Sequence, residues 1–280
     1  MIVDCHAHLL PPWRMAKLIQ WQRRFTPSHP IHETVTLDAL LDEYARAGVA
    51  RIWNFAHAIF PDETEVLNEW NRRLAETHPG IIPFGTCHPL APDPLAVIDR
   101  CLGEYGFAGM KFHPFVQRFT PWEARYFPLY ERIAWHGGIV VFHTGFEAFY
   151  GGTLPLPELE AVPRAFPELV VVLAHANYPN VREAFEAVAR HPHVYLDTVH
   201  VFSRVTAGWD PGSQDAAWAA LRDGLTAFPD RVMFGTDHPS GTGTLEEMYR
   251  DFRAFGLPGE LEERLLGETA QRLVEKARPR

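Results

Sequence analysis

Eight short apolar runs, each bounded by turn-forming residues, recur along the 280 residues of this chain. The segments between them place apolar residues at helical spacing, so strand and helix alternate throughout. Nearly continuous apolar strands of this kind are typical of a parallel sheet that helices cover. Eight such units predict an α/β fold in which one (β/α)8 TIM barrel spans residues 1–280 as a single domain. The runs are residues 2–9, 50–57, 81–88, 108–114, 138–145, 169–177, 194–199 and 231–239.

Local signals mark where several helices begin and end. Thr36 is placed to cap a helix that Gly48 ends, and Asp93 precedes a proline at the first helical position. Further helices are expected over residues 181–190 and 214–228. The spacing of a capping box occurs twice, at Asp62 with Glu65 and at Thr244 with Glu247.

An open, doubly wound sheet is the alternative fold. No glycine-rich phosphate loop follows the first run, where a nucleotide-binding fold would carry it. No linker or charge run marks a domain boundary. Three connections, about 10–35, 145–157 and 200–212, are longer than a minimal loop and all follow the carboxyl ends of predicted strands. In a barrel these connections gather on one face, so we expect them to form the walls of a substrate pocket.

Polar residues end the apolar runs, and in a barrel these ends converge on one rim. His6 and His8 alternate on the first run and therefore project the same way. Neutral imidazoles with one carboxylate suit zinc, or manganese or iron in a harder site. Such an ion lowers the pKa of bound water from 15.7 to about 7, and a nearby imidazole can then move protons. The polar residues at the run ends are His6, His8, His57, His88, Lys111, His113, His143, His175, His200, Asp237 and His238.

Composition narrows the class of partner. The formal net charge is -9 and the basic residues are scattered, so no basic stripe offers a nucleic-acid footprint. No apolar stretch approaches the roughly 20 residues that cross a bilayer, and the N-terminus lacks the pattern of a signal peptide. The three cysteines form no paired framework. We therefore expect a cytoplasmic protein that binds a small molecule, neither nucleic acid nor membrane, with a homodimer through the outer helices as an open expectation.

Four signatures, DCHAHLLP, VFHTG, LAHAN and FGTDHP, stand in register on the first, fifth, sixth and eighth runs. They resemble the amidohydrolase superfamily, and within it the branch of metal-dependent hydrolases and decarboxylases that includes the aminocarboxymuconate-semialdehyde decarboxylases. The position of His143 and His175 alone does not separate a metal ligand from a base. The resemblance implies that His6, His8, His143 and Asp237 hold one divalent metal, with Asp237 also at the catalytic centre, and that His175 transfers protons beside the bound water.

Two-metal members of the superfamily bridge the ions through a residue of the fourth strand. Here that strand reads GMKFHP and contains no carboxylate, so Lys111 is the one candidate bridge. In the similar branch a lysine at this place is not usually modified. One metal, Zn²⁺ with Mn²⁺ or Fe²⁺ as alternatives, is therefore the expectation.

Several residues admit an ordinary structural role. His57, His88, His200 and His238 are individually expected to be structural, while His113 could be either structural or functional. Asp4 either orients a ligand or hydrogen-bonds the barrel floor. Residues 146–152, FEAFYGG, either line a pocket or cover the barrel. We keep Lys111, His113 and Asp4 as candidates for contacting the substrate or supporting the ligands.

Two reactions suit such a site. Activated water can attack a small carboxylate-bearing substrate, a lactone, an ester or an amide, with His175 protonating the leaving group. The same site can decarboxylate an unsaturated or aromatic acid, which needs a cation for the carboxylate; Arg14, Lys111, Arg118 and Arg204 are candidates. Decarboxylases of the branch that the chain resembles tend to be longer, so the resemblance together with the compact length favours hydrolysis, with decarboxylation as the alternative. A binding protein of this fold that had lost its chemistry is a further alternative, and such a chain should lack one of the site residues. All five are present: His6, His8, His143, His175 and Asp237.

Overall fold

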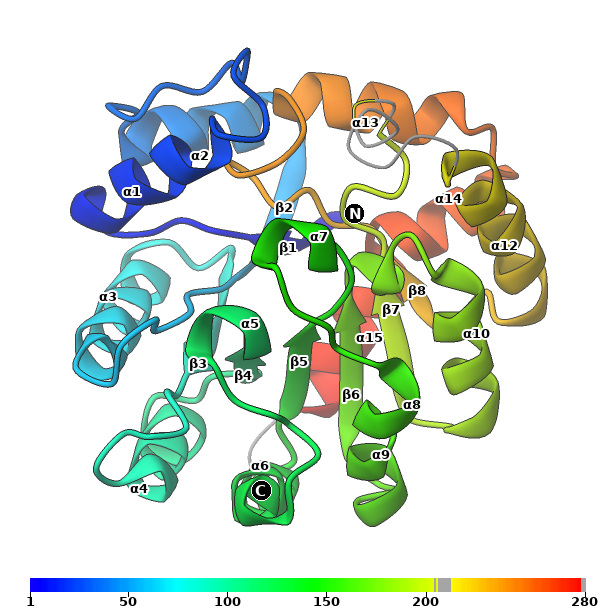
Figure 1. Ribbon diagram of the computed structural model, residues 1–280. Coiled ribbons are helices and arrows are strands. Elements are labelled where there is room, and N and C mark those ends of the chain that lie inside the picture. Colours follow the sequence, from blue (N-terminus) through cyan, green and yellow to red (C-terminus); the bar gives the residue numbers. More distant parts are fainter. Residues whose placement is uncertain (204, 206–212, 278–280) are drawn as a thin grey trace.

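Eight parallel strands form one sheet in the order β1 to β8, with helices around it (Figure 1). The computed structural model describes residues 1–203, 205 and 213–277. The observed architecture is the predicted (β/α)8 TIM barrel. The strands are β1 Ile2–Ala7, β2 Val49–Asn54, β3 Ile81–Thr86, β4 Gly109–Phe112, β5 Ile139–His143, β6 Val170–Ala174, β7 Val194–Asp197 and β8 Val232–Met233.

The barrel closes between β8 and β1 through few backbone contacts. β8 contains two residues, and the bridge to β1 pairs Ala7 with His238 beyond the end of that strand. The amide of Cys5 donates to the carbonyl of Phe234 at 3.2 Å, and the amide of Asp237 donates to the carbonyl of His6 at 2.7 Å. Closure is therefore made beside the residues that the sequence singled out for chemistry.

Helices lie outside the strands, and most of the predicted caps are present. Thr36 accepts from the amide of Ala39, and Asp93 caps α4. The described α-helices are α1 Pro12–Gln22, α2 Leu37–Arg46, α3 Glu63–Thr77, α4 Pro94–Asp99, α5 Pro114–Gln117, α6 Phe127–Trp135, α7 Glu147–Tyr150, α8 Leu156–Leu159, α9 Ala161–Ala165, α10 Val181–Arg190, α12 Gln214–Ala227, α13 Leu245–Ala254, α14 Gly259–Glu263 and α15 Thr269–Lys276. No helix in the described ranges is long and apolar enough to cross a membrane.

One of the two predicted capping boxes is present and the other is not. Thr244 and Glu247 form the complete box at the start of α13. Asp62 makes no cap to α3, because its own backbone is already helical and a cap residue needs extended geometry. The carboxylate of Glu63 instead accepts from the amides of Ile59 and Phe60.

Two strands end earlier than the sequence predicts. The sixth run was expected to extend to residue 177, but β6 ends at Ala174 and a short 3-10 turn, His175–Asn177, follows. Its residues have φ between 45° and 62°, a left-handed conformation that ends a strand. Asp237 has φ 62° in the last run, which was expected to extend to residue 239. The polar residues stand where the chain turns out of the sheet.

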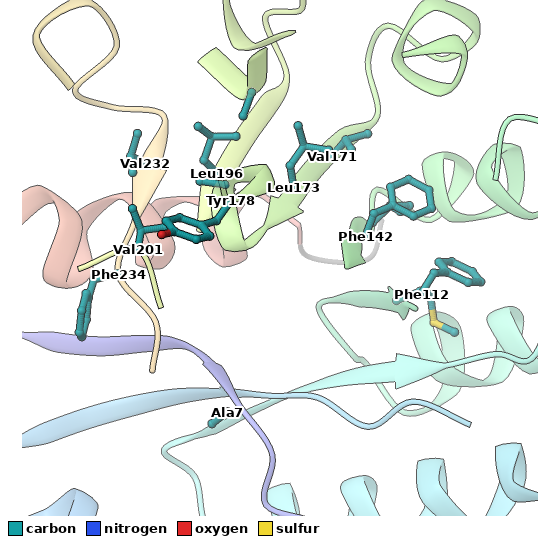
Figure 2. Close-up of a cluster of buried hydrophobic side chains, with 14 of the residues drawn as sticks. Ala7, Phe112, Phe142, Val171, Leu173, Tyr178, Leu196, Val201, Val232 and Phe234 are labelled. Atoms are coloured by element: carbon teal, nitrogen blue, oxygen red, sulfur yellow. The ribbon is translucent and has the colours of Figure 1, made fainter. Parts of the chain in front are cut away.

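Strand parity divides the core into two clusters and also positions the site. Val140 and Phe142 of β5 pack against the surrounding helices, in the cluster that Figure 2 shows in part. Ile139 and Val141 fill the barrel interior. Because alternate residues share a face, His143 continues the interior row at the carboxyl end of the strand. On β4, Lys111 alternates with the helix-facing Met110 and Phe112 and therefore points inward. On β1 the interior residues are Val3 and Cys5, and His6 lines the cavity where the register with β2 shifts between Asp4 and Ala7.

Candidate functional site

A cavity of about 450 Å³ lies at the carboxyl ends of the strands. Its walls come from the strand ends and from α1 and α7, which lie in two of the three long connections. Most of the third connection, residues 206–212, lies outside the described residues. The polar lining that the strand ends supply is His6, His8, His57, Lys111, His113, His143, His175, His200 and Asp237.

Three of the predicted ligands form a compact group. The nearest nitrogen or carboxylate atoms of His6, His8 and Asp237 all lie within 4.8 Å of one another. Nε2 of His8 is 2.9 Å from Oδ1 of Asp237, and Nε2 of His6 is 3.3 Å from the same oxygen. The left-handed backbone of Asp237, tied to the His6 carbonyl, holds the carboxylate between the two rings.

In His6 and His8, the hydrogen bond of Nδ1 determines whether Nε2 carries a proton or a lone pair. Nδ1 of His8 donates to the carbonyl of Phe55 at 3.0 Å, and Nδ1 of His6 donates to Oδ2 of Asp197 at 2.8 Å. Burial lowers the pKa of His6 well below its usual value, so this ring is neutral. We assign the proton of each ring to Nδ1, because the backbone carbonyl and the carboxylate accept hydrogen bonds. Both Nε2 atoms then present lone pairs towards Asp237.

The carboxylate of Asp237 completes a set of three acceptors. Burial alone would raise its pKa, but the positive charge of a protonated His8 or His6 and hydrogen bonds from His200 and His8 outweigh that effect and hold the pKa well below its usual value. A bound cation would take the place of the protons on the facing nitrogens of His8 and His6. Oδ2 of this carboxylate is 3.2 Å from Nε2 of His200. With the proton of each ring on Nδ1, the two Nε2 atoms and the carboxylate fit a divalent transition metal, because a cation satisfies all three acceptors.

His143 and His175 share the cavity but form a pair of their own. Nδ1 of His143 is 3.1 Å from Nε2 of His175, so one ring donates to the other. Burial lowers the pKa of both imidazoles well below the usual value. Within the described ranges the compact ligand group contains His6, His8 and Asp237 but not His143. The amide of His175 donates to Oδ1 of Asp197 at 2.6 Å, which fixes the turn that carries the ring.

Lys111 is a buried cation beside this cluster. Its Nζ lies 3.4 Å from Nε2 of His6 and 5.0 Å from the ring centre of Phe55. Burial lowers the pKa of its ammonium group to about 8. The residue is 1% exposed yet lines the cavity, so a molecule that entered the cavity would meet its ammonium group.

Asp4 supports the barrel and does not contact the ligand side chains. It accepts from the amides of His6 and Thr236, at 3.0 and 3.1 Å, and from the hydroxyl of Tyr44 at 3.0 Å. Burial raises its pKa to about 6, although these hydrogen bonds oppose the increase. These contacts join β1 to the segment after β8, and one of them holds the backbone of His6, so both expected roles stay open.

The remaining candidates divide between the cavity and its surroundings. His57 and His200, expected to be structural, line the cavity, whereas His88 and His238 are not among its lining residues. Phe146, Phe149 and Tyr150 line it as well, so the stretch 146–152 forms part of the wall. Among the candidate cations, Arg14 and Lys111 line the cavity and Arg118 does not, and Arg204 lies outside the described residues.

Sequence reasoning missed Asp197, which contacts both His6 and His175. A signal was available, because a carboxylate inside the apolar run VYLDTV needs a polar partner when the strand is buried. The sequence shows His200 as a single histidine outside any motif. Its place beside Asp237 follows from the turn after β7, where its φ is 67°, and no motif marks that turn.

This fold and this donor set define a metal-dependent TIM-barrel class of protein. The family model described as amidohydrolase matches residues 3–276, and the chain therefore belongs to that amidohydrolase family. Protein fluG of Emericella nidulans is 36% identical over 80 residues, which are 28% of this chain and 8% of that protein. The chain thus matches only a small part of that relative's length.

Solved structures resemble the whole chain at low identity. An uncharacterized TIM-barrel protein from Bordetella bronchiseptica has a TM-score of 0.76 at 22% identity, with 99% of each chain covered. The 5-carboxyvanillate decarboxylase of Novosphingobium aromaticivorans, solved with manganese, has 0.69 at 14%, covering 98% of this chain and 96% of that one. A probable 2-pyrone-4,6-dicarboxylic acid hydrolase from Acinetobacter baumannii has 0.65 at 13%, covering 98% and 99%. These similarities support the fold.

Proposed function

We propose that this protein is a metal-dependent hydrolase of a small carboxylate-bearing substrate, a lactone, an ester or an amide. One observation carries the proposal: the acceptor group of His6, His8 and Asp237 lies in the same cavity as the hydrogen-bonded pair His143 and His175. Membership of the amidohydrolase family supports the same class of chemistry.

Each part of the site has a proposed role. His6, His8 and Asp237 would hold the ion, with His143 as the fourth ligand that the family resemblance implies. A divalent ion supplies Lewis acidity, which polarises a substrate oxygen and makes water more acidic. His175 would take a proton at its ring nitrogen and return it to the leaving group, because burial keeps this imidazole neutral and able to accept. Lys111 would seat a negative group of the substrate.

Decarboxylation of an unsaturated or aromatic acid is the second candidate. The cavity has aromatic side chains in its walls, including Trp21, Phe146 and Phe149, and buried cations at Arg14 and Lys111. These features suit a planar anion, and a decarboxylase is among the proteins of similar fold. The arrangement of His175 would serve this reaction too, since a carbon atom must be protonated when carbon dioxide leaves.

A metal assay followed by a substrate panel tests the proposal. We expect about one zinc, manganese or iron per chain, and hydrolysis products from panel substrates that appear without carbon dioxide. His175→Asn should reduce turnover by about 100-fold or more, the usual contribution of a positioned acid–base group. His193→Asn, which alters a histidine 38% exposed outside the cavity, is the matched control.

The possible results separate the candidates. Carbon dioxide release without addition of water would replace hydrolysis by decarboxylation. A protein without metal, or with turnover unaffected by His175→Asn, would contradict both. A cytoplasmic location and a homodimer belong to the same proposal, and light scattering on the purified protein tests the dimer.

A further inference from the structure

Tyr150 lies in the wall of the cavity, and aromatic rings pack against it. It ends α7, in the connection after β5, and its ring is parallel to Phe115 of α5 at 4.9 Å and to Trp21 of α1 at 5.8 Å. Three separate connections of the barrel therefore fix the plane of one phenol. Its hydroxyl lies 3.2 Å from Nε2 of His113, which also lines the cavity.

The environment of His113 determines the direction of that hydrogen bond. The ring is 4% exposed and stacks on His143 at 3.7 Å, with an angle of 10° between the planes. Nδ1 of His113 is buried and has no hydrogen-bonding partner among the residues that the structure describes. A buried imidazole without a carboxylate partner is neutral and carries one proton. That proton belongs on Nε2, because on Nδ1 it would be a buried donor without an acceptor.

With the proton of His113 on Nε2, the hydroxyl proton of Tyr150 is not used in the hydrogen bond between these two side chains. Nε2 of His113 donates to the oxygen of Tyr150, so the O–H of Tyr150 has to donate elsewhere. Within the described ranges, His113 is its one hydrogen-bonding partner. The cavity that both side chains line is the remaining direction.

We propose that the Tyr150 hydroxyl donates a hydrogen bond to a negatively charged oxygen of the substrate, and that His113 is the positioning residue that directs it. This inference rests on the proposed function, since it assigns a donor to the same site. A fixed donor aimed at an oxygen that gains charge in the transition state costs no reorganisation during the reaction. The sandwich of aromatic rings supplies that rigidity independently of His113.

Tyr150→Phe tests the donor, because it removes one oxygen and keeps the ring that packs against Trp21 and Phe115. We expect kcat/KM to fall by at least about 10-fold, up to the 100- to 1,000-fold typical of a lost oxyanion donor, with metal content and Tm unchanged. Tyr105→Phe is the matched control, since Tyr105 precedes β4 at the opposite end of the barrel. A change of less than about twofold in Tyr150→Phe overturns the proposal.

Replacements of His113 test its positioning role. His113→Leu removes the donor to Tyr150, whereas His113→Gln offers an amide N–H in its place and should recover part of the activity. If His113 acts through Tyr150, His113→Leu should have little further effect in a Tyr150→Phe background. Fully multiplicative losses with normal metal content would exclude that role.

A binding measurement separates this inference from the proposed reaction. Benzoate, a planar carboxylate, is titrated into the metal-loaded wild type and Tyr150→Phe by calorimetry. Weaker binding to Tyr150→Phe supports the donor even if no panel substrate is turned over, a result that would contradict the proposed function alone. Equal binding to the two proteins, or no binding to either, together with unchanged or absent turnover, overturns the donor role.

Discussion

At the scale of single residues, Asp197 organises two functional side chains at once. One of its oxygens accepts from Nδ1 of His6, and the other accepts from the amide of His175. Burial raises the pKa of Asp197, but the cationic Lys111 nearby opposes the increase. The carboxylate therefore fixes which nitrogen of His6 carries the proton without taking a place among the proposed ligands.

Replacing Asp197 by Asn should weaken metal binding while the barrel stays folded. The amide can still accept from His175, but it holds the proton on Nδ1 of His6 less firmly, so the lone pair on Nε2 is less available. We expect metal affinity to fall by about 10- to 100-fold, measured by competition with a chelator. Asp42→Asn, an exposed change on α2, is the control, and equal affinities in both variants would contradict this role.

Site residues that belong to a sequence motif could be identified from the sequence. Residues that contact the site only because the chain turns there could not. The alternation of His6 and His8 in the first run predicts that both side chains reach one site. Both line the cavity, although β1 ends at Ala7 between them. His200 reaches Asp237 because the chain turns left-handed after β7. A left-handed histidine has no sequence signature, since the surrounding structure imposes it.

At the scale of secondary-structure elements, the strand starts were predictable and the ends were not. An apolar run specifies which residues are buried, and both a strand and the turn that follows it are buried at this rim. β6 and β8 were therefore expected to be longer than they are. The two capping boxes had the same sequence spacing, but only one of them forms. Thr244 has the extended backbone that a cap needs, and Asp62 does not.

An ion-pair cluster joins the short helices α8 and α9 to α10. Glu160, 5% exposed, accepts from both Arg190 and His191. Burial alone would raise its pKa, but these hydrogen bonds outweigh burial and hold the pKa below its ordinary value. A carboxyl with a lowered folded pKa stabilises the protein above its unfolded pKa, and this stabilisation is lost as pH falls through the folded pKa.

Glu160→Gln should therefore lower the free energy of unfolding at neutral pH and have less effect in acid. We expect a loss of about 1–2 kcal/mol at pH 7, the size of a charge-assisted hydrogen bond, shrinking as the pH falls below about 4. Denaturant unfolding at several pH values measures this difference in the free energy of unfolding, with the exposed Glu158→Gln as control. A loss that does not depend on pH would show that the ionised carboxyl is not its source.

At the scale of the whole molecule, the proposed metal site spans the seam that closes the barrel. His6 lies on β1 and His8 directly after it, whereas Asp237 follows β8, and few backbone hydrogen bonds join these two segments. An ion held by residues on both sides would link the first and last strands of the sheet. Binding to the folded state alone adds stability, about 2.7 kcal/mol at a metal concentration a hundred times Kd.

Chelation should accordingly destabilise the barrel from this seam. With roughly 2–4 °C per kcal/mol for a domain of this size, we expect Tm to fall by about 5–10 °C when the metal is removed. The amides of Cys5, His8 and Asp237, which donate across the seam, should exchange faster, while that of Ile139 between β4 and β5 should not. His8→Ala should start with the lower Tm and respond little to chelator, because it lacks a ligand rather than a part of the core. Uniform acceleration of exchange across all strands would instead indicate that the metal stabilises the fold without acting at the seam.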